Sequence, residues 1–174
     1  MSESENKLHT LLFGVRRSVR YHSHRQRFFR NLNQLSNFLG LVLGSAAVVA
    51  FMSSQASSYG AYAAALAAVI SAASLVFSFS ERANQHENLK REFIEIEQSL
   101  AENDDEDNIL SMEQKRLQIE TQEPSKLYAL DLLCHNEVVR AIYSREEVKD
   151  HIVKIRWRER MTANFVAWPQ ITPI

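Results

Sequence analysis

Fifty consecutive residues, from Asn31 to Ser80, contain no Asp, Glu, Lys, Arg or His, although charged residues make up 24% of the chain. Two strongly apolar runs, 35–52 and 59–79, lie inside this stretch and are separated by a short Ser-rich connector, 53–58. Each run has the roughly 18 to 20 residues that an α-helix needs to cross a ~30 Å hydrocarbon core. Because so short a connector allows only a tight turn, the runs predict an antiparallel transmembrane hairpin with both flanks on one side of the membrane.

The distribution of charge favours this prediction over the alternative, a helical hairpin buried in a soluble protein. Residues 1–30 carry seven Lys or Arg and two Glu, a net charge of +5, whereas residues 81–174 carry 13 basic and 19 acidic residues, a net charge of −6. A basic segment next to the first span keeps an N-terminus in the cytoplasm, and an uncharged connector is easily translocated. The expected location is the bacterial inner membrane, as a multi-pass protein with both termini cytoplasmic.

Length and composition divide the 174 residues into three expected parts: a basic cytoplasmic N-terminal helix, 1–34, a two-helix transmembrane hairpin, 35–80, and a cytoplasmic helical bundle or coiled-coil domain, 81–174. Only four Gly and three Pro are present, which suits long helices, and no segment alternates at the two-residue period of a strand. The expected class is therefore an all-α membrane protein. The single cysteine, Cys134, excludes a disulfide framework and fits a reducing compartment.

Residues 7–33 predict a helix with one apolar face, which includes His22, and one basic face. Its basic residues alternate with aromatic ones, a combination that can bind nucleic acid. They lie, however, where anionic headgroups would be, and each such charge near a lipid surface contributes about 1 kcal/mol to binding. The lipid bilayer therefore explains the cluster, and nucleic acid is not an expected partner. The expected lipid contacts are Arg16, Arg17, Arg20, Arg25, Arg27 and Arg30.

Both predicted spans have a face of small residues, which lets helix backbones approach closely in lipid. The first span has a Gly-x-x-x-Gly pair, and in the second span small and mildly polar residues share one face of a helical wheel. This small face either packs on the first span of the same chain or, in a homo-oligomer, lines a water-filled path. The residues of this pore or packing face are Gly40, Gly44, Ala64, Ala67, Ser71, Ser74 and Ser78.

After the second span, residues 83–101 predict a helix that continues the span into the cytoplasm without a hinge. Acidic residues 102–108 are expected to form a solvated loop, and capping patterns at Ser111 and Ser144 predict the starts of two later helices, with another over 125–143. The apolar residues of the 83–101 helix recur at steps of four, three and four, which forms a packing seam for the N-terminal helix or another subunit. The seam is Leu89, Phe93, Ile96 and Leu100.

The only cluster that resembles catalytic chemistry is Cys134-His135-Asn136-Glu137. Adjacent residues on a helix point about 100° apart, so Cys134 and His135 do not form a nucleophile and base pair. No histidine has a second good metal ligand at suitable spacing, and His22 and His24 face apart. The sequence therefore predicts no enzyme, cofactor or metal ion. Interhelical hydrogen bonds are expected from His135, Asn136 and Glu137, the last with an Arg of the first helix.

Two stretches and the order of the helices resemble the SLATT family, bacterial two-transmembrane proteins associated with SMODS nucleotidyltransferases and SLOG nucleotide-sensor domains. The stretches are Arg-Tyr-His-x-x-Arg-Gln-Arg-Phe-Phe, residues 20–29, and Leu-Asp-Leu-Leu-Cys-His-Asn-Glu-Val, residues 130–138. The resemblance implies an effector in anti-phage or abortive-infection defence that perturbs the membrane once a partner senses infection or makes a nucleotide signal. It implies no active-site residue, and it implies that the sensor or nucleotidyltransferase is a separate protein.

Three functions remain open on the sequence. An effector that oligomerises and forms or gates a pore should be multimeric and toxic when triggered. A membrane anchor or scaffold should be harmless and should bind a soluble partner through its acidic C-terminal part. A holin-like lysis protein would also have few spans and charged tails, but 94 residues after the hairpin exceed what timed lysis requires.

Overall fold

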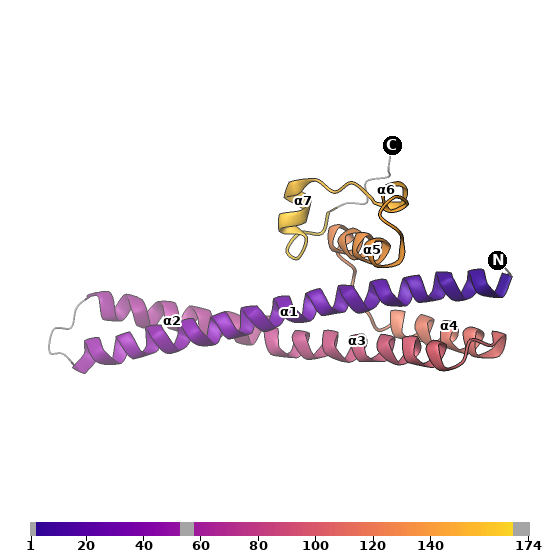
Figure 1. Ribbon diagram of the computed structural model, residues 1–174. Helices are drawn as coiled ribbons and strands as arrows, with labels where there is room; N and C mark the ends of the chain where they lie inside the picture. The colour runs from indigo at the N-terminus through magenta and orange to yellow at the C-terminus, as the bar shows by residue number, and fades with distance from the viewer. Residues whose placement is uncertain (1–2, 53–57, 169–174) are drawn as a thin grey trace. The chain divides into compact units, whose positions relative to one another are not determined.

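The computed structural model describes residues 3–52 and 58–168, and all regular elements in these ranges are helices (Figure 1). The expected all-α class is therefore confirmed for the described residues. The chain divides into two compact units, which we call the helical-core unit, Met1–Arg25 with His86–Ile174, and the hairpin unit, Gln26–Gln85. The helices are α1 (Glu3–Met52), α2 (Ser58–Phe77), α3 (Phe79–Glu102), α4 (Glu106–Glu120), α5 (Tyr128–Ile142), α6 (Val148–His151) and α7 (Trp157–Thr162).

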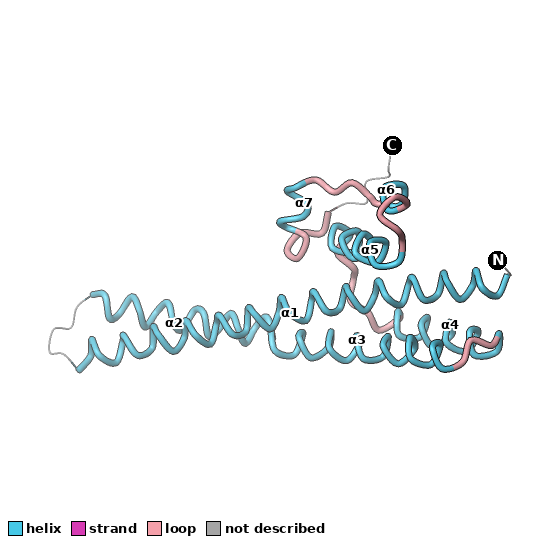
Figure 2. The backbone as a smooth tube through the Cα atoms, in the orientation of Figure 1, coloured by secondary structure: helices cyan, strands magenta, loops and turns pink. Residues whose placement is uncertain are grey.

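In the hairpin unit, the C-terminal part of α1 and the whole of α2 lie side by side and run antiparallel (Figures 1 and 2). Half-buried residues recur every three or four positions along both helices and mark the stripe where they meet. Near the connector this approach requires a glycine, because a Cβ at Gly60 would lie 2.5 Å from the Cβ of Ala50. Residues 53–57 of the predicted connector lie outside the described residues.

Two helical segments are long and apolar enough to cross a membrane, one in α1 and one in the α2–α3 segment. Their most apolar windows of 18 residues have mean hydropathies of 1.4 and 2.0, and 0% of either window is buried. Large apolar side chains stand exposed on both helices, for example Leu41 at 71% and Val76 at 77%. A hairpin that served as the core of a soluble protein would be covered. Within the described residues this chain does not cover it, which favours lipid as its surroundings.

The expected uninterrupted helix from the second span into the following segment is wrong. α2 ends at Phe77 and α3 begins at Phe79, because Ser78 has a φ of 46°, in the left-handed region. A non-glycine residue in that region costs roughly 1–2 kcal/mol. The break is held by side chains: the Ser78 hydroxyl donates to the Leu75 carbonyl at 3.2 Å, and Nε of Arg82 donates to the Phe77 carbonyl at 3.0 Å. The hairpin unit therefore contains a one-residue break in the helix at Ser78.

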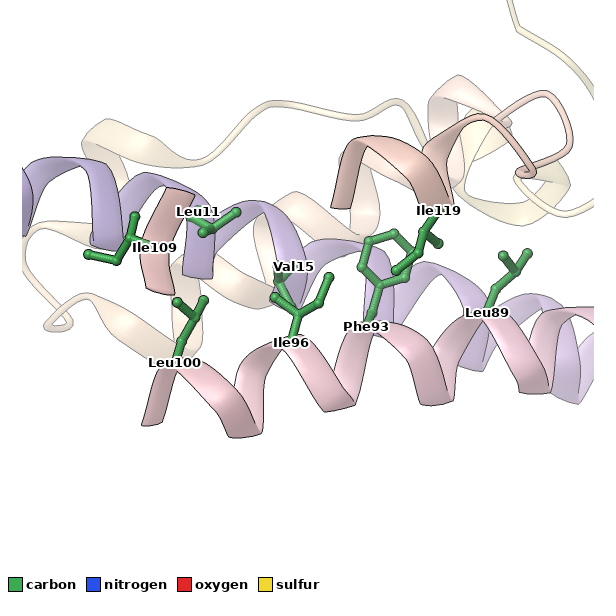
Figure 3. Close-up of a cluster of buried hydrophobic side chains, with 8 residues drawn as sticks. All are labelled: Leu11, Val15, Leu89, Phe93, Ile96, Leu100, Ile109 and Ile119. Carbon is green, nitrogen blue, oxygen red and sulfur yellow. The ribbon is translucent and has the colours of Figure 1, made fainter. Parts of the chain in front are cut away.

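An apolar cluster from three helices forms the core of the helical-core unit (Figure 3). The four seam residues predicted on α3 are at most 4% exposed. Leu11 and Val15 of α1 and Ile109 and Ile119 of α4 complete the cluster. Burying one such side chain contributes about 1.5–3 kcal/mol. The seam therefore packs on the N-terminal helix of its own chain, one of the two partners that the sequence left open.

Two helix starts differ from the capping patterns. α4 begins at Glu106, inside the acidic segment expected to be a loop, because Asp105 is its N-cap and accepts a hydrogen bond from the Asn108 amide at 2.7 Å. Ser111 lies inside this helix. α5 begins at Tyr128 rather than at the expected position 125, since the Leu127 amide donates to the Tyr21 hydroxyl at 2.9 Å and leaves the segment before it extended.

The last expected helix is broken in two. Ser144 is not the expected cap: α6 begins at Val148 with Glu147 as its N-cap, and it ends at His151. The Glu147 carboxylate accepts hydrogen bonds from the Ser144 amide at 3.2 Å and from the Ser144 hydroxyl at 2.8 Å. The side chain of Asn136 explains this early end: it donates to the Val153 carbonyl at 2.8 Å and accepts from the Val153 amide at 2.9 Å. Both backbone groups of Val153 are thereby taken from any continuing helix, and the chain stays extended until α7.

Candidate functional site

The small face of α2 is not one continuous surface. Ala67 and Ser74 are half-buried on the side toward α1, whereas Ala64 and Ser71 are exposed. The half-buried residues of α2 form a stripe that is offset from the predicted small face and includes Ile70. A wheel of 100° per residue shows which residues share a face, but side-chain shape decides which part of that face meets the partner helix. Part of the face therefore packs on α1, and the water-filled path along the exposed part stays a prediction.

A side chain added at Gly40 or Gly44 would point into open space and not toward α2. Among the described residues, no atom outside their own helix lies within 4 Å of a Cβ built at either position. Instead they border an open groove of about 460 Å³ on the surface of α1. A helix face without side chains lets a neighbouring helix approach closely in lipid. The lining residues of the groove are Gly40, Leu41, Gly44, Ser45, Val48 and Val49.

Ser74 carries a polar group that the hairpin does not satisfy. Its Oγ is buried and, in the part of the chain that is described, has no hydrogen-bond partner. The Ser45 hydroxyl, in contrast, donates to the Leu41 carbonyl of its own helix at 2.7 Å. An unsatisfied hydroxyl in apolar surroundings is unfavourable by about 1–3 kcal/mol.

The six arginines expected to contact lipid fall into two groups. Three belong to the helical-core unit and bind other elements of it: Arg16 Nε donates to Glu97 at 2.7 Å, Arg17 Nε lies 3.4 Å from Asp131, and Arg25 donates to the Asn164 carbonyl at 2.8 Å. These three arginines therefore have partners within the protein, and their expected contact with lipid stays a prediction. The Arg20 guanidinium donates to a backbone carbonyl of its own helix, and Arg27 and Arg30 are exposed.

A buried row of three titratable side chains, which the sequence does not predict, crosses the helical-core unit. His22 of α1 is 0% exposed and lies between His86 of α3 and Glu123. Its Nδ1 is 2.9 Å from Nδ1 of His86, and its Nε2 is 2.9 Å from the Glu123 carboxylate. The ring also stacks on Phe93, with centroids 5.7 Å apart. The only sequence signal was the place of His22 on the apolar face of the first helix.

The hydrogen bonds of this row determine which of its atoms donate and which accept. Burial acts to raise the pKa of Glu123, but hydrogen bonds from His22 and Lys126 and the Lys126 charge together hold that pKa below its ordinary value. The carboxylate is therefore an acceptor, and Nε2 of His22 must donate to it. The hydrogen bond between Nδ1 of His22 and Nδ1 of His86 requires that one of these nitrogens carries a proton and the other accepts it. A proton on both nitrogens would break the bond. The row is a satisfied polar network that joins α1, α3 and the segment before α5.

The three predicted polar residues of α5 all make contacts beyond their own helix. His135 Nε2 lies 3.2 Å from the His151 carbonyl, and Asn136 binds the backbone of Val153. Glu137 pairs with Nε2 of His24, at 3.0 Å from Oε1 and 3.2 Å from Oε2. The expected arginine partner of Glu137 is therefore wrong, and a histidine of the same N-terminal helix takes its place.

Cys134 is fully buried beside this pair. Burial, helped by the charges of Glu137 and Asp131 and opposed by Arg20 and Arg17, raises the pKa of the Cys134 thiol far above its ordinary value. A protonated thiol is a poor nucleophile, so Cys134 as it stands lacks the activation of a catalytic cysteine. His24, Cys134 and Glu137 nevertheless present three ligand atoms within 4.8 Å of one another. Spacing along the chain could not show this, because His24 comes from α1 and the other two from α5.

Comparisons with family models, with curated proteins and with solved structures give no match to this chain. The resemblance to the SLATT family therefore rests on the residues of the two quoted stretches and on the order of the helices, and it remains a prediction.

Proposed function

We propose that this protein is a two-span effector of the bacterial inner membrane, with both termini in the cytoplasm, that assembles into oligomers and forms or gates an ion path. In this proposal it acts in anti-phage or abortive-infection defence, under the control of a separate sensor or nucleotide-signalling protein. It is a binding and assembly protein rather than an enzyme.

The observation that carries the proposal is the uncovered hairpin. Neither apolar window contains a buried residue, and the groove along Gly40 and Gly44 is open. Lipid accounts for the exposed apolar surface, and a neighbouring copy of the hairpin accounts for the bare glycine backbone. Because two helices enclose no lumen, an ion path needs several copies. The exposed position of Ser71 on α2 supports a face that meets water or a further helix in that assembly.

Charge supports the proposed orientation. Arg27 and Arg30 stand exposed just before the apolar part of α1, where they fit anionic headgroups on the cytoplasmic side. Labelling of an engineered cysteine tests this: Ser57→Cys should react with a membrane-impermeant maleimide from the outside, and the control His9→Cys should react only after the cells are opened. Labelling of Ser57→Cys only from the inside, or a protein that stays in solution without detergent, would contradict the topology.

Membrane potential tests the ion path. A voltage-sensitive dye should report depolarisation after phage infection of cells that express the chain and its sensor. Ser71→Leu, at an exposed position of α2, should abolish it, because a bulky apolar side chain closes a hydrated path by size and dewetting. The matched control Ala65→Leu adds the same kind of bulk at another exposed position of α2 and should leave depolarisation intact.

Two results would point elsewhere. Unchanged depolarisation in Ser71→Leu would remove this residue from the path. If the wild-type protein inserts and never depolarises the cell, the anchor or scaffold function is favoured, with the helical-core unit as the part that holds a soluble partner.

A further inference from the structure

We propose that His24, Cys134 and Glu137 form a binding site for one divalent transition-metal ion of the zinc class, which bridges α1 and α5 within the helical-core unit. The three side chains offer one nitrogen, one sulfur and one oxygen, and these atoms lie within 4.8 Å of one another. The site is independent of the proposed function, because it lies outside the hairpin and needs neither lipid nor a second copy of the chain.

The geometry is close to what such an ion requires. Bonds of about 2.0–2.3 Å in a tetrahedral arrangement place neighbouring ligand atoms roughly 3.3–3.6 Å apart. Nε2 of His24 is already 3.0 Å and 3.2 Å from the two carboxylate oxygens of Glu137. Small side-chain rotations are therefore enough to open the pair around an ion. Cys134 and Glu137 are three residues apart on α5, so they project from the same face of that helix.

The ligand types select the metal. A thiolate and an imidazole suit Zn²⁺, Co²⁺, Ni²⁺ or Cu, whereas Mg²⁺ and Ca²⁺ prefer oxygen ligands alone. Binding forms the metal–sulfur bond in exchange for the thiol proton, which passes to solvent. One divalent ion then meets one thiolate and one carboxylate, so the ion and its ligands carry no net charge. Such neutrality suits a site with a fully buried side chain at its base.

One side of the site is open to solvent, so a fourth ligand can bind there. Cys134 is 0% exposed, whereas the side chains of His24 and Glu137 are 37% and 40% exposed. Water can therefore reach the outer side of the ion and complete a tetrahedron, as in zinc sites with three protein ligands. The neighbouring His135 is not part of this set, because its Nε2 lies against the His151 carbonyl. It provides a matched control on the same helix.

Cobalt provides the direct test on the full-length protein in detergent. Titration of the metal-free protein with Co²⁺ should give a sulfur-to-cobalt charge-transfer band in the near ultraviolet that saturates at one ion per chain, and Zn²⁺ should displace it. Cys134→Ser should lose this band. Glu137→Gln, at a half-exposed position where an amide can still accept from His24, should weaken Co²⁺ binding more than tenfold, since even outer-shell partners are worth about 10–100-fold. His135→Gln should bind Co²⁺ as the wild type does.

A stability measurement separates lost ligands from lost folding. In the presence of a chelator, Glu137→Gln and His135→Gln should both show the helical circular dichroism of the wild type. Added Zn²⁺ should raise the melting temperature of the wild type and of His135→Gln but not that of Glu137→Gln. The proposal is overturned if the wild type gives no charge-transfer band, or if a folded Glu137→Gln variant binds Co²⁺ as tightly as the wild type.

Discussion

The Glu123 carboxylate is 5% exposed and accepts hydrogen bonds from His22 and from the Lys126 ammonium, at 2.9 Å and 2.8 Å. These contacts favour the ionised form over the protonated form more than burial disfavours it, and they hold the pKa of Glu123 below its ordinary 4.5. A carboxyl group whose pKa is lower in the folded state than in the unfolded state stabilises the fold above the unfolded value. That contribution is lost as the pH falls through the folded value.

Acid sensitivity is therefore expected to depend on Glu123. The melting temperature of the wild type should fall steeply below about pH 4.5, the ordinary value for this group. Glu123→Gln should be less stable at pH 7, by about 1–3 kcal/mol, because His22 and Lys126 lose a charged acceptor. Its melting temperature should fall less steeply below pH 4.5. Circular dichroism melts between pH 7 and pH 3.5 measure the melting temperatures, with Glu146→Gln at an exposed position as the control. If the melting temperatures of all three proteins fall equally with pH, Glu123 is not the group responsible.

At the scale of the helices, sequence patterns predicted where apolar surface lies better than where helices end. The apolar runs of α1 and α2 and the seam of α3 follow from long periodic signals. Helix ends depended on single side chains from distant segments: Asn136 binds Val153, and the Tyr21 hydroxyl holds the Leu127 amide. Such contacts span 17 and 106 positions, so no local pattern carries them. The helix break at Ser78 could not be predicted either, since serine has no preference for a positive φ.

Phe93 tests whether the α3 seam works within one chain. Its side chain is 0% exposed, in contact with the cluster of α1 and α4 and stacked on His22. Phe93→Ala should lower the free energy of unfolding by about 3–5 kcal/mol through lost burial and a cavity. Leu110→Ala on the exposed side of α4, at 56% exposure, should change it by less than about 0.5 kcal/mol. If Phe93→Ala instead changes the oligomer mass and leaves the melting temperature alone, the seam joins subunits.

At the scale of the whole molecule, the same kind of residue serves two different contacts. Gly60 lies where a Cβ would meet Ala50 of the same chain, whereas Gly40 and Gly44 border open space. The sequence showed that all three are small residues in apolar helices, which is the general signature of close packing. It could not show which of them pack inside the hairpin, because that depends on how far α2 is rotated toward α1. The structure separates contacts within a chain from surface left for a neighbour.

Adding a bulky side chain should therefore have different effects at Gly40 and Gly44 than at Gly60. The double variant Gly40→Leu, Gly44→Leu should fill the open groove and leave the hairpin and the helical circular dichroism intact. It should reduce the oligomer mass, because a neighbouring helix can no longer approach the backbone of α1 closely. Gly60→Leu should instead force α1 and α2 apart near the connector and lower the melting temperature. Ala65→Leu, at an exposed position of α2, controls for added apolar bulk. Light scattering of the detergent-purified proteins measures the mass; an unchanged mass in the double glycine variant would place the subunit contact on another face of the hairpin.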